Sequence, residues 1–300
     1  MDSGDPGAAS ALDQAASVFE GLRPRLFGIA YRMLGSSAEA EDVVQDVWVR
    51  WQSADRAAVM DPAAFLATAT TRLAMNVAQS ARRRREAYVG PWLPEPVDTS
   101  ADPYARAERG EALELAVLLL LERLTPTERA AYVLRESFDY PYDQIAAILR
   151  LNEANIRQLV SRARKRVVAE RRKPVSSAAH RRLLKAFLAA ARTGDLAALE
   201  RLFAVDVVSY SDGGGAVRGV ARIPVAGRTR VAKFVAAFAP RFWPGATIAW
   251  VEANGRPGVL VSHGEAVAAL VTISASAEGI DQIMWVMNPA KLGRISAALP

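Results

Sequence analysis

Apolar residues recur at helical spacing through the first half of the chain. Between residues 22 and 34 they fall on one side of a helix, at Leu22, Leu26, Ile29, Ala30 and Met33. A second helix starting near Ala38 collects its apolar residues on one face, at Val43, Val44, Val47, Trp48 and Trp51. Asp61 followed by Pro62 is typical of an N-cap and a first helical turn. It predicts a third helix that continues into the arginine run at residues 82–85.

Proline then interrupts the pattern. Residues 91–96 contain three prolines, and such a segment cannot be helical because proline lacks the backbone donor and clashes with the preceding turn. We therefore predict an extended linker over residues 89–103. The helical pattern returns from about Tyr104 to Lys173, and the segment 174–177 forms a second boundary.

The last part of the chain has a different pattern. Helices are predicted at residues 180–192 and 196–203, and runs rich in Val and Ile follow at 205–210, 246–252, 259–261, 266–273 and 280–287. Turn signals separate these runs, among them Asp212 with three glycines after it and the pair Asn254 and Gly255. Helices followed by antiparallel strands predict an α+β domain.

Charge and composition limit which partners, metal sites and cellular locations we expect. The net charge is +6, with basic runs at residues 82–85 and 162–173, which indicates either a polyanion partner or solvated helix faces. Without cysteine, and with only His180 and His263, we expect no metal site and no cofactor. The first ten residues lack the pattern of a signal peptide, and the apolar run 115–121 is too short to cross a bilayer. We expect a soluble cytoplasmic protein with no membrane partner.

Residues 124–168 have the spacing of a helix-turn-helix. A helix near 128–135 precedes a short helix at 142–149, a turn at 150–152 and a third helix at 153–168. Five apolar residues would pack between the helices: Ile145, Leu149, Ile156, Val160 and Ala163. The third helix then presents long donors and arginines outward, as DNA recognition requires, at Asn155, Arg157, Gln158, Ser161 and Arg162. The alternative is a helical hairpin with a basic solvent face.

Two further helices carry polar surfaces. Asp42, Gln45 and Asp46 lie opposite the apolar face of their helix, either as a solvated face or as a docking surface for a basic partner. The helix at 63–88 combines small polar residues, arginines and a terminal aromatic residue, which suits contact with unstacked single-stranded DNA. Its candidate contacts are Thr68, Thr71, Arg72, Asn76, Arg82 and Arg83.

Together these segments resemble the sigma-70 family, and within it the extracytoplasmic-function (ECF) sigma factors. The resemblance implies docking of Asp42, Gln45 and Asp46 on the β′ clamp helices of core RNA polymerase, with the β flap as a second polymerase contact. It implies −10 promoter recognition by the helix over residues 61–85 and −35 recognition by residues 145–163. Arg150 stands where this turn usually has glycine, so it would adopt a strained conformation.

Three further motifs resemble those of sigma factors with a fused SnoaL-like domain. They are Trp92, Leu93, Pro94, Glu95 and Pro96 in the linker, Asp212, Gly213, Gly214 and Gly215 after a strand, and Asn288, Pro289, Lys291 and Leu292 near the end. The resemblance implies that the C-terminal domain regulates in cis by packing on region 2 and on the linker. From the residues alone, Trp92 and Leu93 could dock onto another domain, or Trp92 could cap the core of the first domain. Glu95 could pair with a basic group or with backbone donors of the glycine loop at 213–215.

We therefore expect a multidomain chain. Its fold class is two all-α sigma domains, a region 2 helical bundle (13–88) and a region 4 helix-turn-helix (108–173), with a linker at 89–107 and an α+β SnoaL-like cone at 178–300. Two alternatives stay open. The chain could be a one-component DNA-binding regulator whose C-terminal domain senses a small ligand. That domain could instead be an enzyme using Asp206, Tyr210, Asp212 or His263, although no spacing selects a catalytic pair.

Overall fold

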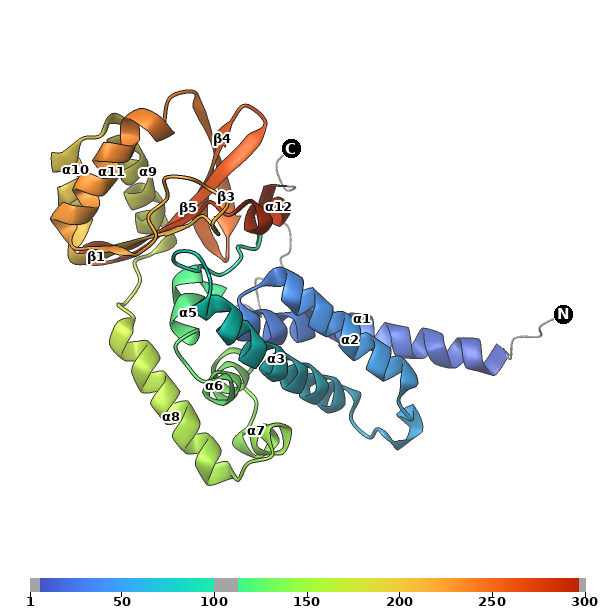
Figure 1. Cartoon of the computed structure of the whole chain (residues 1–300). Helices are drawn as coiled ribbons and strands as arrows, with labels where there is room; N and C mark the ends of the chain where they lie inside the picture. Colours follow the sequence, from blue (N-terminus) through green and yellow to red (C-terminus); the bar gives the residue numbers. More distant parts are fainter. Residues whose placement is uncertain (1–5, 100–112, 297–300) are drawn as a thin grey trace. The chain divides into compact units, whose positions relative to one another are not determined.

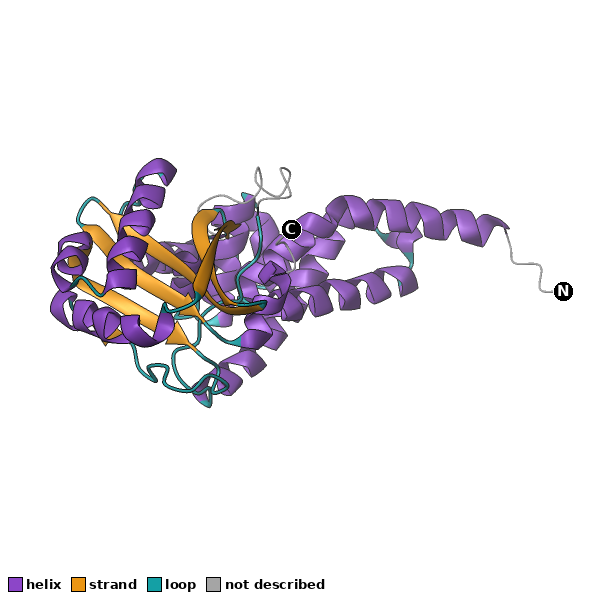
Figure 2. Cartoon of the chain, turned by 90° about the horizontal axis from the view of Figure 1, so that it is seen from above, coloured by secondary structure: helices purple, strands orange, loops and turns teal. Residues whose placement is uncertain are grey.

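The computed structural model describes residues 6–99 and 113–296. Within these ranges the chain forms two compact units (Figure 1). The first contains residues 6–83 and 121–166, and the second contains 84–99, 113–120 and 167–296. The strands all belong to the second unit (Figure 2). The predicted start of a helix near Tyr104 lies outside the described residues.

The first unit begins with long helices. They are α1 (Pro6–Leu34), α2 (Ser37–Ser53), the 3-10 turn η1 (Arg56–Ala58) and α3 (Pro62–Glu86). Ser36 caps α2 by accepting a hydrogen bond from the Glu39 amide at 3.3 Å. Four of the five residues predicted for the apolar face of α2 are buried, and the fifth, the half-buried Trp48, packs on Phe19 at a ring distance of 4.9 Å. Hydrophobic periodicity therefore placed this face correctly.

The second half of the unit is a helix-turn-helix. It consists of α6 (Pro126–Phe138), α7 (Tyr142–Leu149) and α8 (Glu153–Glu170). A capping box between Thr125 and Glu128 starts α6. Four of the five predicted core residues are buried, but Leu149 is only half-buried and Ile148 takes the interior position. The error arises because Ile145 and Ile148, one turn apart, define the buried face of this short helix.

Arg150 ends α7 in the left-handed region, at φ 55° and ψ 45°. The expectation of a strained non-glycine turn is confirmed. The two halves of the unit also touch one another. The Arg25 guanidinium donates to the Phe138 carbonyl at 3.1 Å, and the buried Arg129 donates to the Met33 carbonyl at 2.6 Å.

The second unit is built on one six-stranded sheet with the order β2-β1-β6-β5-β4-β3. The strands are β1 (Phe203–Asp212), β2 (Val225–Ala226), β3 (Ala246–Ala253), β4 (Arg256–His263), β5 (Ala266–Ser276) and β6 (Gly279–Val286). The prediction of antiparallel strands is wrong for one pair, because β1 runs parallel to β6. The other neighbouring strands are antiparallel, including the β3–β4 hairpin at the predicted Asn254–Gly255 turn.

Helices cover one face of this sheet: α9 (Ser177–Thr193), α10 (Leu196–Leu202) and α11 (Arg228–Phe242) (Figure 1). Their buried side chains pack on strand residues such as Val207, Val261 and Ile283. The predicted order of helices first and strands after is wrong here, because α11 lies between β2 and β3. This core contains the rings of Phe187, Phe242 and Trp285.

The opposite face carries a second core, which includes residues from the linker. Leu93 is fully buried there beside Leu115 of α5 (Leu115–Leu121) and Leu292 of α12 (Pro289–Ser296). Strand residues Leu260 and Met284 complete the contact from the sheet side. The linker is therefore part of the folded second unit.

No helix in the described ranges is both long and apolar enough to span a membrane.

Candidate functional site

The outer surface of α8 carries all five residues predicted to face DNA. Each is exposed. Arg157 is ion-paired with Glu153 one turn earlier, and its guanidinium lies 4.4 Å from the centre of the Tyr142 ring. Asn152 caps the helix by accepting a hydrogen bond from the Asn155 amide at 2.8 Å. The N-terminal turns of this helix thus offer an accessible and partly ordered set of donors.

The predicted docking residues on α2 are accessible as well. Asp42, Gln45 and Asp46 are exposed, whereas the intervening Val43 and Val44 are buried. Because residues 42, 45 and 46 lie within one turn, they form a continuous polar face.

The candidate DNA contacts on α3 divide into two groups. Thr68 is half-buried, and Asn76, Arg82 and Arg83 are exposed. Thr71 is fully buried on the face of α3 that also buries Ala67 and Ala74. Its expected accessibility to DNA is therefore wrong for this arrangement of the helices.

Arg72 is also engaged within the unit. Its guanidinium donates to the carbonyls of Ile148 at 2.8 Å and Ala147 at 3.1 Å, at the C-terminal end of α7. Free carbonyls and the helix dipole favour a cation at this position. In this conformation a residue predicted to read the −10 element is held by the helix-turn-helix instead.

The linker is anchored on Asp212, the last residue of β1. Asp212 is fully buried, and its carboxylate accepts hydrogen bonds from four groups. One oxygen receives the Tyr88 hydroxyl at 2.5 Å and the Gly214 amide at 3.1 Å. The other receives the Leu93 amide at 2.9 Å and the Lys291 ammonium at 2.6 Å. We call Tyr88, Leu93, Asp212, Gly214 and Lys291 the linker anchor.

Lys291 joins the linker to α12. Besides its ion pair with Asp212, its ammonium donates to the Leu93 carbonyl at 2.6 Å and lies 4.5 Å from the Trp92 ring centre. Burial lowers the pKa of Lys291, and the Asp212 carboxylate opposes that shift. Burial also raises the pKa of Tyr88, and the hydrogen bond to Asp212 adds to this rise, so the hydroxyl stays a donor at neutral pH.

The glycine loop fits closely around this anchor. Gly214 has φ +60°, and a Cβ there would collide with the Asn288 side-chain amide, which donates to the Tyr88 hydroxyl at 2.9 Å. The amides of Met287 and Asn288 both donate to the Asp212 carbonyl at 2.8 Å. The motifs at 212–215 and 288–292 therefore meet at one point, and glycine is required at 214 by both space and backbone conformation.

The five linker residues are placed unequally. Leu93, Pro94, Glu95 and Pro96 are buried, whereas Trp92 is half-buried with the Arg85 guanidinium 3.7 Å from its ring centre. Asp212 forms hydrogen bonds that join the glycine loop to the linker. Gly213 is buried, Gly215 is exposed beside Val89, and Pro289 is exposed at the start of α12.

Downstream of the motif the linker pairs with β3. Val97 and Asn254 exchange hydrogen bonds, Asp98 forms a bridge with Ala253, and the Thr99 amide donates to the Glu252 carbonyl at 3.0 Å. Sequence reasoning missed this pairing and also Tyr88, which it assigned to a DNA-binding helix. The Asn254–Gly255 turn was visible, but nothing in the sequence showed that Asn254 would bind the linker.

The candidate acid–base residues do not form one catalytic site. Asp206 is exposed and paired with Arg172 at 2.8 Å, and His263 is exposed at the end of β4. Tyr210 packs with the second core, and Asp212 belongs to the linker anchor. This arrangement gives no support to the enzyme alternative.

Comparison with known proteins places these features in one family. The model of sigma-70 region 2 matches residues 18–86, and that of sigma-70 region 4 matches residues 114–167. The ECF RNA polymerase sigma factor SigJ of Mycobacterium tuberculosis is 39% identical over 237 residues, which cover 76% of this chain and 74% of the relative. This chain belongs to the ECF RNA polymerase sigma factors.

Other members of the ECF sigma factors extend the match over nearly the whole chain. The probable ECF sigma factor SigI of the same species is 31% identical over 293 residues, covering 96% of this chain and 98% of the relative. The crystal structure of M. tuberculosis SigJ superimposes with a TM-score of 0.76 at 32% identity, covering 95% of this chain and all of that one. The predicted family and the predicted fold class, helical sigma domains with an α+β C-terminal domain, are confirmed.

Proposed function

We propose that this ECF sigma factor binds core RNA polymerase, directs it to promoters through α3 and α8, and is regulated in cis through its linker. We assign region 2 to residues 13–88, the linker to 89–107, region 4 to 108–173 and the regulatory domain to 178–300, the bounds predicted from the sequence. The observation that carries the regulatory part is the linker anchor, in which a buried carboxylate of the C-terminal domain holds the segment between the two promoter-reading regions.

Polymerase docking is assigned to the polar face of α2. The exposure of Asp42, Gln45 and Asp46 supports this role, with the β′ clamp helices as the partner and the β flap as the partner of region 4. We expect Asp46→Arg to abolish binding to core polymerase, because the reversed charge repels a basic surface. Glu20→Arg, a charge reversal at another exposed position on α1, is the matched control. Equal affinity of both variants would refute this assignment.

Promoter reading is assigned to residues on two helices, all exposed except the half-buried Thr68 and Arg72, and Arg72 would have to leave the α7 carbonyls to reach DNA. On α8 these are Asn155, Arg157, Gln158, Ser161 and Arg162, which face the −35 element. On α3 they are Thr68, Arg72, Asn76, Arg82 and Arg83, which face the −10 element. Each good base contact contributes about 1–3 kcal/mol of discrimination. With holoenzyme on a selected promoter, Arg157→Ala should relax the preference at one base pair, whereas Lys165→Ala, exposed further along α8, should keep it. Unchanged specificity in Arg157→Ala would contradict this role.

Regulation in cis follows from the position of the linker. While Leu93 is buried in the second core and its amide is bonded to Asp212, the linker cannot move independently of the sheet. Any arrangement of promoter-reading regions that needs a free linker must break the anchor first. The C-terminal domain therefore sets which arrangements are populated.

Point variants test regulation through the linker better than truncation of the C-terminal domain does. A chain ending at Lys173 would expose Leu93 and Leu115, which are buried against the sheet, so lost activity could reflect aggregation. Lys291→Met removes only the ammonium that bridges Asp212 and the Leu93 carbonyl. In transcription assays with core polymerase, it should change transcript yield without changing promoter choice. Lys185→Met, at an exposed position on α9, is the control, and equal yields from both would reject regulation through the anchor.

A further inference from the structure

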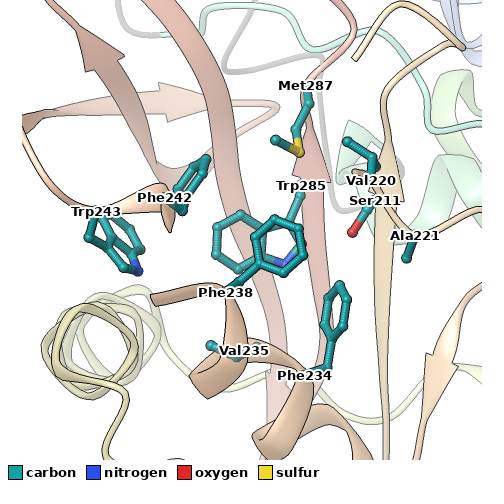
Figure 3. Close-up of a pocket in the computed structure, with 10 residues that line it drawn as sticks. All are labelled: Ser211, Val220, Ala221, Phe234, Val235, Phe238, Phe242, Trp243, Trp285 and Met287. Atoms are coloured by element: carbon teal, nitrogen blue, oxygen red, sulfur yellow. The ribbon is translucent and has the colours of Figure 1, made fainter. Parts of the chain in front are cut away.

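The C-terminal domain contains two neighbouring pockets that share part of their lining, which we call the inner chamber and the outer chamber. The inner chamber lies between α11 and the sheet, and its walls are almost wholly apolar (Figure 3). The aromatic rings of Phe234, Phe238, Phe242, Trp243 and Trp285 line it. It leaves about 30 Å³ for the centre of a water-sized sphere, so it is a narrow slot. Aromatic walls around a slot favour a flat ring over a branched aliphatic group.

The outer chamber is wider and more polar. It leaves about 190 Å³ by the same measure and is lined by the glycine loop, by Arg218 and Arg222, and by Val89 and Gly90 of the linker. Ser211, Val220 and Ala221 line both chambers. These shared residues make the two chambers neighbours, so an elongated ligand with a flat apolar end and a polar end suits the pair.

The inner chamber is lined by a buried polar group that lacks a hydrogen-bond partner among the described residues. The Trp285 side chain is 8% exposed, and its indole nitrogen, although buried, has no hydrogen-bond partner among the described residues. Ser211 is the register neighbour of Trp285 on the adjacent strand β1, so its hydroxyl lies on the same face of the sheet. Figure 3 shows both side chains at the wall of the slot. A buried unpaired donor is costly, and a ligand oxygen would satisfy it.

The outer chamber supplies positive charge. Arg218 and Arg222 are exposed at its wall, and none of the described residues that line either chamber is acidic. Guanidinium groups bind carboxylates through paired, charge-assisted hydrogen bonds. We propose that the C-terminal domain binds a small phenolic carboxylate, with its ring and hydroxyl in the inner chamber and its carboxylate beside Arg218 and Arg222.

Such a ligand would contact the linker directly. Val89 and Gly90 form part of the outer wall, Ser211 precedes Asp212, and Met287 precedes Asn288. The occupant thus touches the linker itself and both strand ends that hold the anchor. This regulatory consequence rests on the proposed function, whereas binding can be measured without polymerase.

The experiment is a titration of the full chain with 3-(4-hydroxyphenyl)propionate, followed by NMR of the tryptophan indole N–H signals. Trp285→Phe identifies the signal, and Ser211→Ala serves where that variant folds poorly. We expect the Trp285 signal to shift with saturation and a Kd on the order of 1 mM. 3-Phenylpropionate, which lacks the hydroxyl, should bind about fivefold more weakly, and the neutral amide of the phenolic acid about tenfold more weakly.

Variants distinguish the contributions of the two chambers to ligand binding. The double variant Arg218→Ser with Arg222→Ser should weaken the acid about tenfold and leave the amide unchanged, whereas Arg201→Ser on α10 should affect neither. A Trp285 signal that none of the three compounds moves would overturn the proposal, and so would equal binding of acid and amide. Faster or slower exchange of the Leu93 amide on ligand addition tests the coupling. If binding is seen with no such change, the ligand site stands and its regulatory consequence is refuted.

Discussion

Replacing Asp212 with asparagine perturbs the linker anchor with almost no change in shape. Four donors converge on the carboxylate, but an amide offers only one accepting oxygen. The amide nitrogen is tolerated best beside Tyr88, whose hydroxyl can turn and accept. The Gly214 amide then loses its partner, and Lys291 keeps an oxygen but loses its counter-charge. Breaking a buried ion pair outright costs about 3–5 kcal/mol. Because some hydrogen bonds survive, we expect about 2–3 kcal/mol.

Hydrogen exchange at the Leu93 amide measures this loss where it occurs. That amide is buried and bonded to the Asp212 carboxylate, so it exchanges only when the linker opens. A loss of about 2–3 kcal/mol accelerates exchange roughly 30- to 150-fold when exchange follows the opening equilibrium. Mass spectrometry of the peptide spanning residues 88–97 resolves this change.

Asp206→Asn is the matched control. Asp206 is exposed and its ion pair with Arg172 is at the surface, so its loss should alter exchange at Leu93 by less than about threefold. A double-mutant cycle with Lys291→Met tests the pair directly, since Lys291→Met should cost less in the Asp212→Asn background than alone. If Asp212→Asn leaves exchange at Leu93 at the wild-type rate in a folded chain, Asp212 does not hold the linker.

Three further outcomes follow from local geometry. Gly214→Ala should destabilise the second unit by about 2 kcal/mol or more in thermal unfolding, because its Cβ meets the Asn288 amide at a positive φ, whereas Gly293→Ala, with open space around it, should not. Arg150→Gly should stabilise the helix-turn-helix by about 0.5–1 kcal/mol in urea unfolding. Arg150→Ala removes the charge but keeps a side chain at positive φ, so it should not give the same gain in stability. Burial lowers the pKa of His180 below the unfolded value of 6.5, so the unfolded state takes up a proton first and stability falls as pH drops through 6.5 towards the folded pKa. His180→Gln should flatten that pH dependence, and an equal slope in the wild-type chain and this variant would show that His180 is not its source.

Much of the helical half could be predicted because its signals are local. The spacing of Val43, Val47 and Trp51 and the pairing of Asp61 with Pro62 contain what is needed to place the helices. The exposed and buried sides of α8 also follow from periodicity alone. Thr71 could not be placed, because its burial depends on which neighbouring helix covers that side of α3.

The sheet was harder for a physical reason. Parallel pairing of β1 with β6 joins segments far apart in the chain, and no local pattern encodes a strand's partner. The helix α11 was missed although Val231, Val235 and Ala239 recur at helical spacing, since short Val-rich runs also suit strands. The motifs of the anchor were visible, but the roles of Tyr88 and Asn254 depend on contacts that only the folded chain brings together.

We propose that this chain directs polymerase to promoters and is controlled through its anchored linker. The most direct test is transcription by core polymerase on genomic fragments, with the wild-type chain and Asp212→Asn at equal concentrations. We predict that both give transcripts from the same discrete promoters, at yields that differ severalfold. If neither folded protein yields transcripts beyond those of core polymerase, the sigma factor assignment fails. If both give the same yields, control through the anchor is contradicted.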